Sequence, residues 1–234
     1  MVRRVIATKI GEMAQVYEKE FIVSDLIPAF KQLSNDDQDL VRVLCLDSLN
    51  ALARVLSRED NKTHMLPVII QSAEDKSWRV RLALSHNFAE IAESFGKEIT
   101  DLSLVQTFST LLKDVENVVK INAVTSFWKI VKLISSDKLS ILMLLILSLA
   151  KDPSAIVRSS VTSVMANIAG IVPKDLAYQK LLPSINELMR DDNQDVRQGY
   201  QLYTTQCYQS NQQVWRSSRL RNSAVHCATA EDFD

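Results

Sequence analysis

The sequence predicts an all-α protein, a stack of helical hairpins, from three observations. Glycine and proline are scarce, with 4 and 5 copies among 234 residues, whereas a sheet-rich chain needs many turns built from such residues. A Val followed by Arg or Lys recurs at residues 2, 41, 80, 119, 157 and 196, so successive copies lie 38 or 39 residues apart. Apolar residues follow each Val at helical spacing. These features together indicate an array of similar helical units.

The first element is an incomplete unit over residues 1–20. Val2 and Arg3 occupy the repeated position, and the apolar residues after them indicate the second helix of a hairpin whose first helix is absent. Such a helix leaves an apolar face uncovered, whereas solenoids normally end in polar caps. We therefore expect this segment to be a fragment or truncated start within a longer array.

Complete hairpins are expected next, over residues 21–58, 59–98, 99–136, 137–175 and 176–208. In their second helices, apolar residues lie 4, 8, 11 and 15 positions after the Val, as Cys45, Leu49, Leu52 and Leu56 do after Val41. Steps of this size trace one face of an α-helix. One hairpin cannot bury both of its apolar faces, so neighbours must stack into a continuous core.

The first helices carry their own apolar positions and a shared proline. Pro28, Pro67 and Pro183 occupy equivalent places, and a proline inside a helix removes a backbone hydrogen bond and bends the axis. The strongly apolar stretch over residues 139–150 is too short for a membrane span, which needs roughly 20 residues. We interpret it as a buried first helix. Two helices per unit favour HEAT repeats over three-helix armadillo repeats, giving an α-solenoid.

The helical pattern is lost by about Tyr208. Residues 209–234 are polar, rich in serine and without period, which predicts a disordered tail. An altered reading frame or an alternative chain end would produce such a segment too, and the sequence leaves that choice open.

Two charged positions recur in every unit. An Asp stands five residues before each later Val, in the turn between the paired helices, and a cation follows each Val at the start of the second helix. Stacking should bring the Asp of one unit to the cation of its neighbour. The expected inter-repeat ladder comprises Arg3, Asp36, Arg42, Asp75, Arg81, Asp114, Lys120, Asp152, Arg158, Asp191 and Arg197. Direct contact of these residues with a partner protein is the alternative.

A candidate partner-binding site stands beside this ladder. Trp78 occupies a turn position where other units carry Asp39, Asn117, Ala155 or Gln194. Trp and Arg are favoured anchors at protein interfaces, so Trp78 with Arg79 is the first candidate, and Arg4 is a weaker one. The alternative is that Trp78 packs on the neighbouring turn. Trp128, beside Phe127 in a second helix, is expected to be a packing residue.

Composition argues against several other functions. The net charge of −1 gives no general attraction to nucleic acid or to anionic membranes. Cys45, Cys207 and Cys227 are too widely spaced for a metal site or disulfide framework. The three histidines form no metal-binding spacing, and no phosphate-binding or nucleophile motif is present in the sequence. We therefore expect no cofactor, no metal and no enzymatic activity.

Four segments resemble one family. AEDKSWRVR at residues 73–81 looks like the scaffold A subunits of protein phosphatase 2A, and so do VRRVIATKIGE at 2–12, SNDDQDLVRVL at 34–44 and GKEIT at 96–100. The resemblance runs in order over roughly residues 1–197. Lys120 stands where the family usually has Arg, Gln106 interrupts the proline column, and the segment after Gln201 does not resemble the family.

The resemblance implies a non-enzymatic scaffold that joins a catalytic phosphatase subunit to a regulatory subunit through the turns within repeats. This segment resembles middle repeats, so it implies regulatory-subunit contacts more than catalytic-subunit contacts. By analogy, Asp37 and Lys76 join Trp78 and Arg79 on the contact surface. A cytoplasmic location is expected, with the nucleus left open as a second one. The alternative function is another HEAT-repeat adaptor or an importin-like transport protein.

Overall fold

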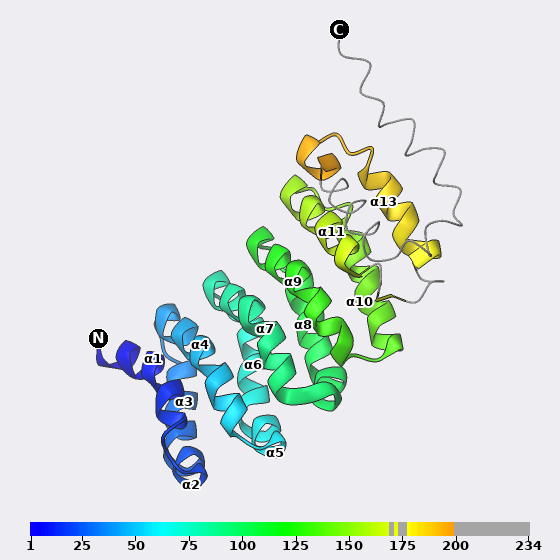
Figure 1. Ribbon diagram of the computed structural model, residues 1–234. Helices are drawn as coiled ribbons and strands as arrows, with labels where there is room; N and C mark the ends of the chain where they lie inside the picture. Colours follow the sequence, from blue (N-terminus) through cyan, green and yellow to red (C-terminus); the bar gives the residue numbers. More distant parts are fainter. Residues whose placement is uncertain (169–170, 173–176, 199–234) are drawn as a thin grey trace.

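The computed structural model describes residues 1–168, 171–172 and 177–198. Within these residues the chain forms helices and turns, with no strand. Hairpins of two helices stand side by side in chain order, from α1 (Val2–Ala14) at one end to α13 (Leu182–Leu188) at the other (Figure 1). The prediction of an all-α solenoid of stacked hairpins is confirmed.

The second helices of the hairpins form one layer, in which each helix packs on the next. This layer consists of α1, α4 (Asp39–Val55), α7 (Trp78–Ile99), α9 (Asn117–Ile130) and α11 (Ala155–Ile168). The repeated Val of each hairpin faces the core: Val41, Val80, Val119 and Val157 are at most 1% exposed. The equivalent Val2, at the start of α1, is 72% exposed.

The first helices form the second layer. They are α2 (Lys19–Phe21) with α3 (Ile27–Ser34), α5 (Arg58–Asp60) with α6 (Leu66–Ala73), α8 (Val105–Leu112), α10 (Ser136–Leu149) and α13. The bend expected at the prolines takes the form of a π-helical turn just before them, at Ile22–Leu26, Asn61–Met65 and Ala177–Leu181. A proline has no backbone N–H to donate to the carbonyl four residues earlier. In a π-helical turn the hydrogen bonds join residues five apart instead of four, so the pairing of the backbone groups before the proline changes.

Proline is not required for this turn. The same π-helical turn, Thr100–Leu104, precedes Gln106, whereas α10 is regular where Leu144 takes the proline's place. Two turns are held by side chains instead: Asn61 donates from Nδ2 to the carbonyl of Ala53 at 2.7 Å, and Thr100 donates from Oγ1 to the carbonyl of Ala92 at 3.0 Å. Packing against the preceding second helix therefore helps to fix the bend.

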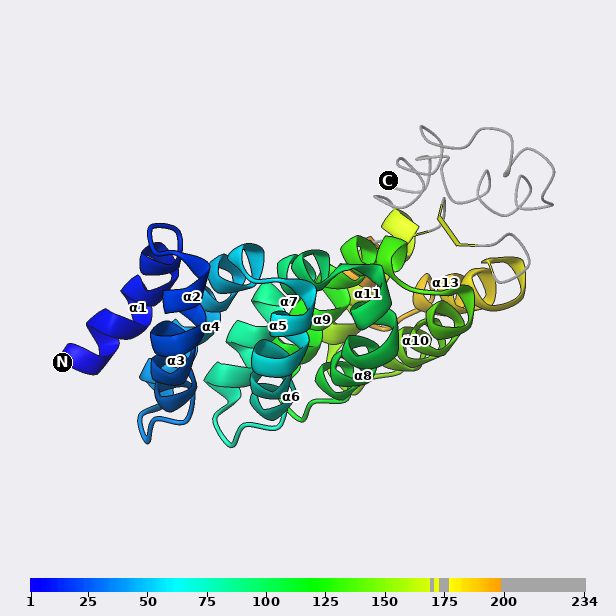
Figure 2. The same cartoon turned by 90° about the horizontal axis from the view of Figure 1, so that it is seen from below.

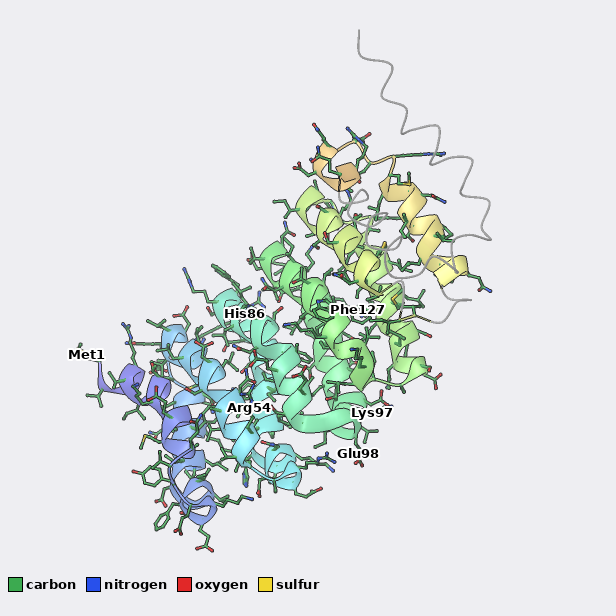
Figure 3. All side chains as sticks on the ribbon, viewed as in Figure 1. Met1, Arg54, His86, Lys97, Glu98 and Phe127 are labelled. Carbon is green, nitrogen blue, oxygen red and sulfur yellow. The ribbon has the colours of Figure 1, made fainter. Side chains whose placement is uncertain are left out.

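The core between the layers is apolar throughout and contains a chain of phenylalanines at its middle. The rings of Phe88 and Phe108 have centroids 5.0 Å apart, and those of Phe108 and Phe127 have centroids 6.3 Å apart. All three side chains are 0% exposed. Figure 3 shows Phe127 between the layers, whereas Arg54, His86, Lys97 and Glu98 lie at the surface. This aromatic chain ties the second hairpin to the third.

Two glycines allow close or unusual backbone geometry. A Cβ placed on Gly11 would lie 2.9 Å from the Cβ of Ala51, so glycine lets α1 approach α4 closely. Gly96 has a φ of 77°, which separates the second helix of one hairpin from the first helix of the next within the span of α7. Such a positive φ favours glycine.

The turns within the hairpins gather along one edge of the array. Figure 2 shows the turns before α4, α7 and α9 as a row of loops on the lower side. We name residues 36–40, 75–79, 114–118, 152–156 and 191–195 the turn ridge. It holds the aspartates of the charged ladder and every residue of the candidate partner site except Arg4.

Candidate functional site: the turn ridge

Each turn of the ridge is built by its aspartate. Asp36, Asp75, Asp114, Asp152 and Asp191 each accept, through Oδ1, a hydrogen bond of 2.8–2.9 Å from the backbone N–H two residues later. An Asp side chain commonly stabilises a turn in this way. The second helix starts three residues after each of these aspartates. The recurrent Asp therefore stabilises the turn between the first helix and the second helix of each hairpin.

The same aspartates bind the cation of the preceding hairpin. Arg3 lies 2.9 Å from Asp36, Arg42 lies 2.8 Å from Asp75, Arg81 lies 2.6 Å from Asp114, Lys120 lies 2.5 Å from Asp152 and Arg158 lies 2.6 Å from Asp191. Arg42, Arg81 and Arg158 each use two guanidinium nitrogens on both carboxylate oxygens. This two-pronged geometry fixes direction as well as distance, so it orients each turn against the next.

The arginines also bind their own turn. Arg42, Arg81, Arg158 and Arg197 donate from Nη1 to the carbonyl of the Asp six residues earlier, at 2.6–2.8 Å. Lys120 has a single ammonium head, which is bonded to Asp152 and makes no second bond within the described part of the chain. A lysine cannot reproduce the guanidinium fork. The residues that would continue the ladder beyond Arg197 lie outside those that the structure describes.

Ion pairing shifts the pKa of several ladder groups. Hydrogen bonds to Asp75, Asp114 and Asp191 raise the pKa of Arg42, Arg81 and Arg158 respectively, against the opposing effect of burial. Burial raises the pKa of Asp75, but hydrogen bonds from the Arg42 side chain and the Ser77 N–H outweigh it, so the pKa falls below its usual range. The hydrogen bond from Arg158 likewise lowers the pKa of Asp191.

Acid should weaken the stack through Asp75. The pKa of Asp75 is lower in the folded chain than in the unfolded chain. Its ionised side chain therefore contributes fully to the free energy of unfolding above about pH 3.9. That contribution falls as the pH drops from there towards the folded pKa, and below the folded pKa it is gone. Urea unfolding of the unchanged chain and of Asp75→Asn, followed from pH 6 to pH 2.5, measures the difference between them. The difference should shrink below about pH 4, and a difference independent of pH would contradict it.

The predicted anchor pair lies at the start of α7. Arg79 places its guanidinium carbon 4.9 Å from the ring centroid of Trp78, a cation–π arrangement. Asp39 of the neighbouring turn lies 3.6 Å from Arg79 and accepts a hydrogen bond of 2.9 Å from Ser77. The Trp78 side chain remains 37% exposed. The ring and its cation are thus held in place at the surface, where a partner could contact them.

The other predicted contact residues are also at the surface. Asp37 and Lys76 are exposed at the tips of neighbouring turns. Arg4 is exposed on α1, and its Nη2 donates to Oε1 of Gln38 at 3.1 Å, so it lies against the first turn of the ridge. The structure brings these residues onto one edge, with Lys76 and Arg79 on the same turn as Trp78 and Arg4 one turn away from it.

A second polar row, which the sequence patterns did not reveal, runs across the second-helix layer. Asn87 on α7 donates from Nδ2 to Asp47 on α4 at 3.1 Å, and Asn50 on α4 donates to both Asn87 and Glu90 at 3.3 Å. Arg54 lies 3.5 Å from Glu90 and projects from the surface of α4 (Figure 3). The offsets of these residues from the repeated Val differ between units, so no sequence column marks them.

Cys45, the cysteine in the described part of the chain, lies in the core. Burial raises the pKa of the Cys45 thiol to about 12, so it stays protonated near neutral pH. Among the described residues, no group of three or more His, Cys, Asp or Glu side chains is placed to hold a metal ion. In that same part of the chain, no helix combines the length and apolarity that crossing a membrane requires. Cys207, Cys227 and His226 lie outside the described residues.

Comparison with known sequences gives one family and two named relatives. A family model described as PIK3R4-like, middle domain, matches residues 1–218. The regulatory A subunit of protein phosphatase PP2A from Schizosaccharomyces pombe is 37% identical over 100 residues, which are 42% of this chain and 17% of that protein. A probable serine/threonine-protein phosphatase PP2A regulatory subunit of Caenorhabditis elegans is 37% identical over 68 residues, which are 29% of this chain and 12% of that protein.

These matches confirm the resemblance predicted from AEDKSWRVR and the other segments. The matched segment nevertheless spans less than a fifth of either relative's length. Among solved structures, Cex1p aligns with a TM-score of 0.66 and 17% identity over 91% of this chain and 46% of that one. Computationally designed armadillo repeat proteins for modular peptide recognition align with a TM-score of 0.55 and 18% identity, over 86% and 92%. At such identities the structures support the fold alone.

Proposed function

The chain belongs to the family described as PIK3R4-like, middle domain, and from this premise we propose that it is a non-catalytic scaffold for a phosphatase 2A-type complex. The family description names no partner, so the partner class rests on the two relatives named as PP2A regulatory subunits. Scaffolding suits an extended stack whose turns are held in line by ion pairs between neighbouring hairpins.

We propose that the ridge binds a regulatory subunit of the phosphatase rather than its catalytic subunit. The preference for a regulatory subunit comes from the resemblance to middle repeats of the scaffold family. The observation that supports the ridge as the contact surface is Trp78, exposed at a turn and covered on one face by Arg79 at 4.9 Å. A rigid aromatic with a fixed cation is a typical interface anchor. Asp37, Lys76 and Arg4 extend the contact on either side. The complex would assemble in the cytoplasm, with the nucleus as a second location.

Truncating the anchor should weaken this interaction without unfolding the chain. Trp78→Ala should cost about 2 kcal/mol of binding free energy, roughly 30-fold in Kd, and Arg79→Ala a smaller amount. The measurement is calorimetric titration of the chain with a purified phosphatase 2A-type regulatory subunit, with helicity followed by circular dichroism.

Trp128→Ala is the matched control. Trp128 is 39% exposed, close to the value of Trp78, and it also lies near a cation, with Lys129 Nζ 5.9 Å from its ring. It was expected to be a packing residue, and it lies at the surface of α9, away from the ridge. This variant should bind as the unchanged chain does. If Trp78→Ala and Arg79→Ala also bind normally, the ridge is not the contact surface. If transport cargo binds and no phosphatase subunit does, the importin-like alternative is favoured.

A further inference from the structure

Two exposed positions of the turn ridge change character along the array. One is the residue after each turn Asp, and the other is the residue before each repeated Val. In order, these pairs are Asp37 with Leu40, Lys76 with Arg79, Val115 with Val118, Pro153 with Ile156, and Asp192 with Asp195. At these two positions the second turn is therefore cationic, the third and fourth are apolar, and the fifth is acidic, although the exposed Glu116 lies between the two valines of the third turn.

The apolar side chains in the middle of this series are open to solvent. Val115 is 86% exposed, Ile156 is 70% exposed and Val118 is 43% exposed. Turns favour Gly, Pro, Asn, Asp and Ser for reasons of local geometry, and a valine at a turn tip satisfies none of them. Packing does not explain it either, because the side chain is almost fully exposed.

The ladder holds the turns that carry these side chains next to one another. Asp114, next to Val115, is bound by Arg81 of the preceding hairpin, and Lys120, two residues after Val118, is bound to Asp152 of the next turn. Successive turns therefore lie side by side, as both views of the array show (Figures 1 and 2). Trp78 extends the apolar surface by one turn. Contiguous exposed apolar surface with a polar rim commonly marks a protein interaction site.

We propose that the regulatory subunit docks on the ridge through a segment with an acidic end, an apolar middle and a basic end. This inference rests on the proposed function. The apolar middle covers Val115, Val118 and Ile156. The acidic end lies at Lys76 and Arg79, and the basic end lies at Asp192 and Asp195, which are both exposed.

The spacing of the repeats sets the length of such a segment. Packed helices lie about 8–10 Å apart, so the second and fifth turns are separated by roughly 24–30 Å. An extended segment of about nine residues or an α-helix of about 20 residues covers that distance. The order of charges fixes its direction, because the reverse orientation would place like charges together at both ends.

The test titrates the purified regulatory subunit with variants of the full chain. The Val115→Asp, Ile156→Asp pair should raise Kd about ten-fold or more, and so should the Asp192→Lys, Asp195→Lys pair. Leu102→Asp is the matched apolar control, since Leu102 is 73% exposed at the opposite end of its hairpin. Glu93→Lys, at an exposed position of α7, is the matched charge control. Both controls should leave Kd within about two-fold of the original.

The outcomes separate this inference from the function on which it rests. If Trp78→Ala weakens binding while the apolar pair does not, the scaffold proposal stands and the apolar contact is wrong. If the unchanged chain does not bind the regulatory subunit, both are wrong. Circular dichroism checks that the Val115→Asp, Ile156→Asp variant remains folded. If that variant unfolds, the milder Val115→Thr, Ile156→Thr variant takes its place, and it should also raise Kd.

Discussion

Replacing Phe108 with alanine should lower the free energy of unfolding by about 3–5 kcal/mol. The side chain is 0% exposed, and its ring contacts those of Phe88 and Phe127, with centroids at 5.0 and 6.3 Å. Removing it takes away apolar burial and leaves a cavity that the stacked helices around it cannot easily close. Phe108 belongs to a first helix and its two neighbours to second helices of successive hairpins, so its loss weakens two interfaces together.

The same substitution should change how the array unfolds. In a repeat protein, each unit contacts only its neighbours, and cooperative unfolding depends on the interfaces between them. A weakened middle should allow the two ends to unfold separately. Urea titration should therefore show a lower midpoint and a shallower transition, and hydrogen exchange should divide into an N-terminal and a C-terminal group of rates. Val115→Ala, at an 86% exposed position, is the near-neutral control. A loss below about 1 kcal/mol for Phe108→Ala would contradict this account of the core.

The hairpin architecture could be predicted from sequence because every unit repeats the same physical solution. Val41, Val80, Val119 and Val157 recur at one place in the helix and are all buried. The charged columns carried equally direct information: Asp75 and Arg42 bind across hairpins at 2.8 Å. Columns of this kind arise because stacking places equivalent residues in equivalent surroundings.

Features that differ between units were not predictable in this way. No proline in the sequence indicates the π-helical turn before Gln106. Thr100 helps to hold that turn through a hydrogen bond to the carbonyl of Ala92, eight residues earlier. The Asn87 row on the second-helix layer uses residues at unequal offsets. Trp128 follows Phe127 directly but is 39% exposed, because neighbouring residues of a helix point in different directions and only Phe127 faces the core.

Comparison between units, on the other hand, reveals residues that the shared fold does not explain. Trp78 was found because other units carry smaller residues at its position. The same comparison could have found Val115 and Ile156, but their hydrophobicity has meaning only once the structure shows that they are exposed. A valine in a helical array is otherwise assumed to be part of the core.

Replacing Arg81 with alanine should lower the free energy of unfolding by about 3 kcal/mol, far more than the loss of an exposed ion pair would. The Asp114 side chain is 4% exposed and loses both bonds from Arg81, keeping the one from the N–H of Glu116. The carbonyl of Asp75 also loses its bond from Arg81. Leaving a buried carboxylate without its cation destabilises a protein by about 3–5 kcal/mol. Because Asp114 keeps its hydrogen bond from the N–H of Glu116, we expect a cost at the lower end of that range.

A double-mutant cycle identifies the origin of this cost. If the orphaned charge of Asp114 is responsible, Arg81→Ala combined with Asp114→Asn should be more stable than Arg81→Ala alone. Arg81→Lys should lower the free energy of unfolding by about 1 kcal/mol, because a lysine keeps the positive charge but cannot bind both carboxylate oxygens as the guanidinium does. Lys120→Arg tests the converse at the rung where lysine occurs naturally, and it should be neutral or stabilising, since it can add a bond to the carbonyl of Asp114. A cost below about 1 kcal/mol for Arg81→Ala would mean that the ladder behaves as exposed surface pairs do, and the alignment of the ridge would then rest on apolar packing alone.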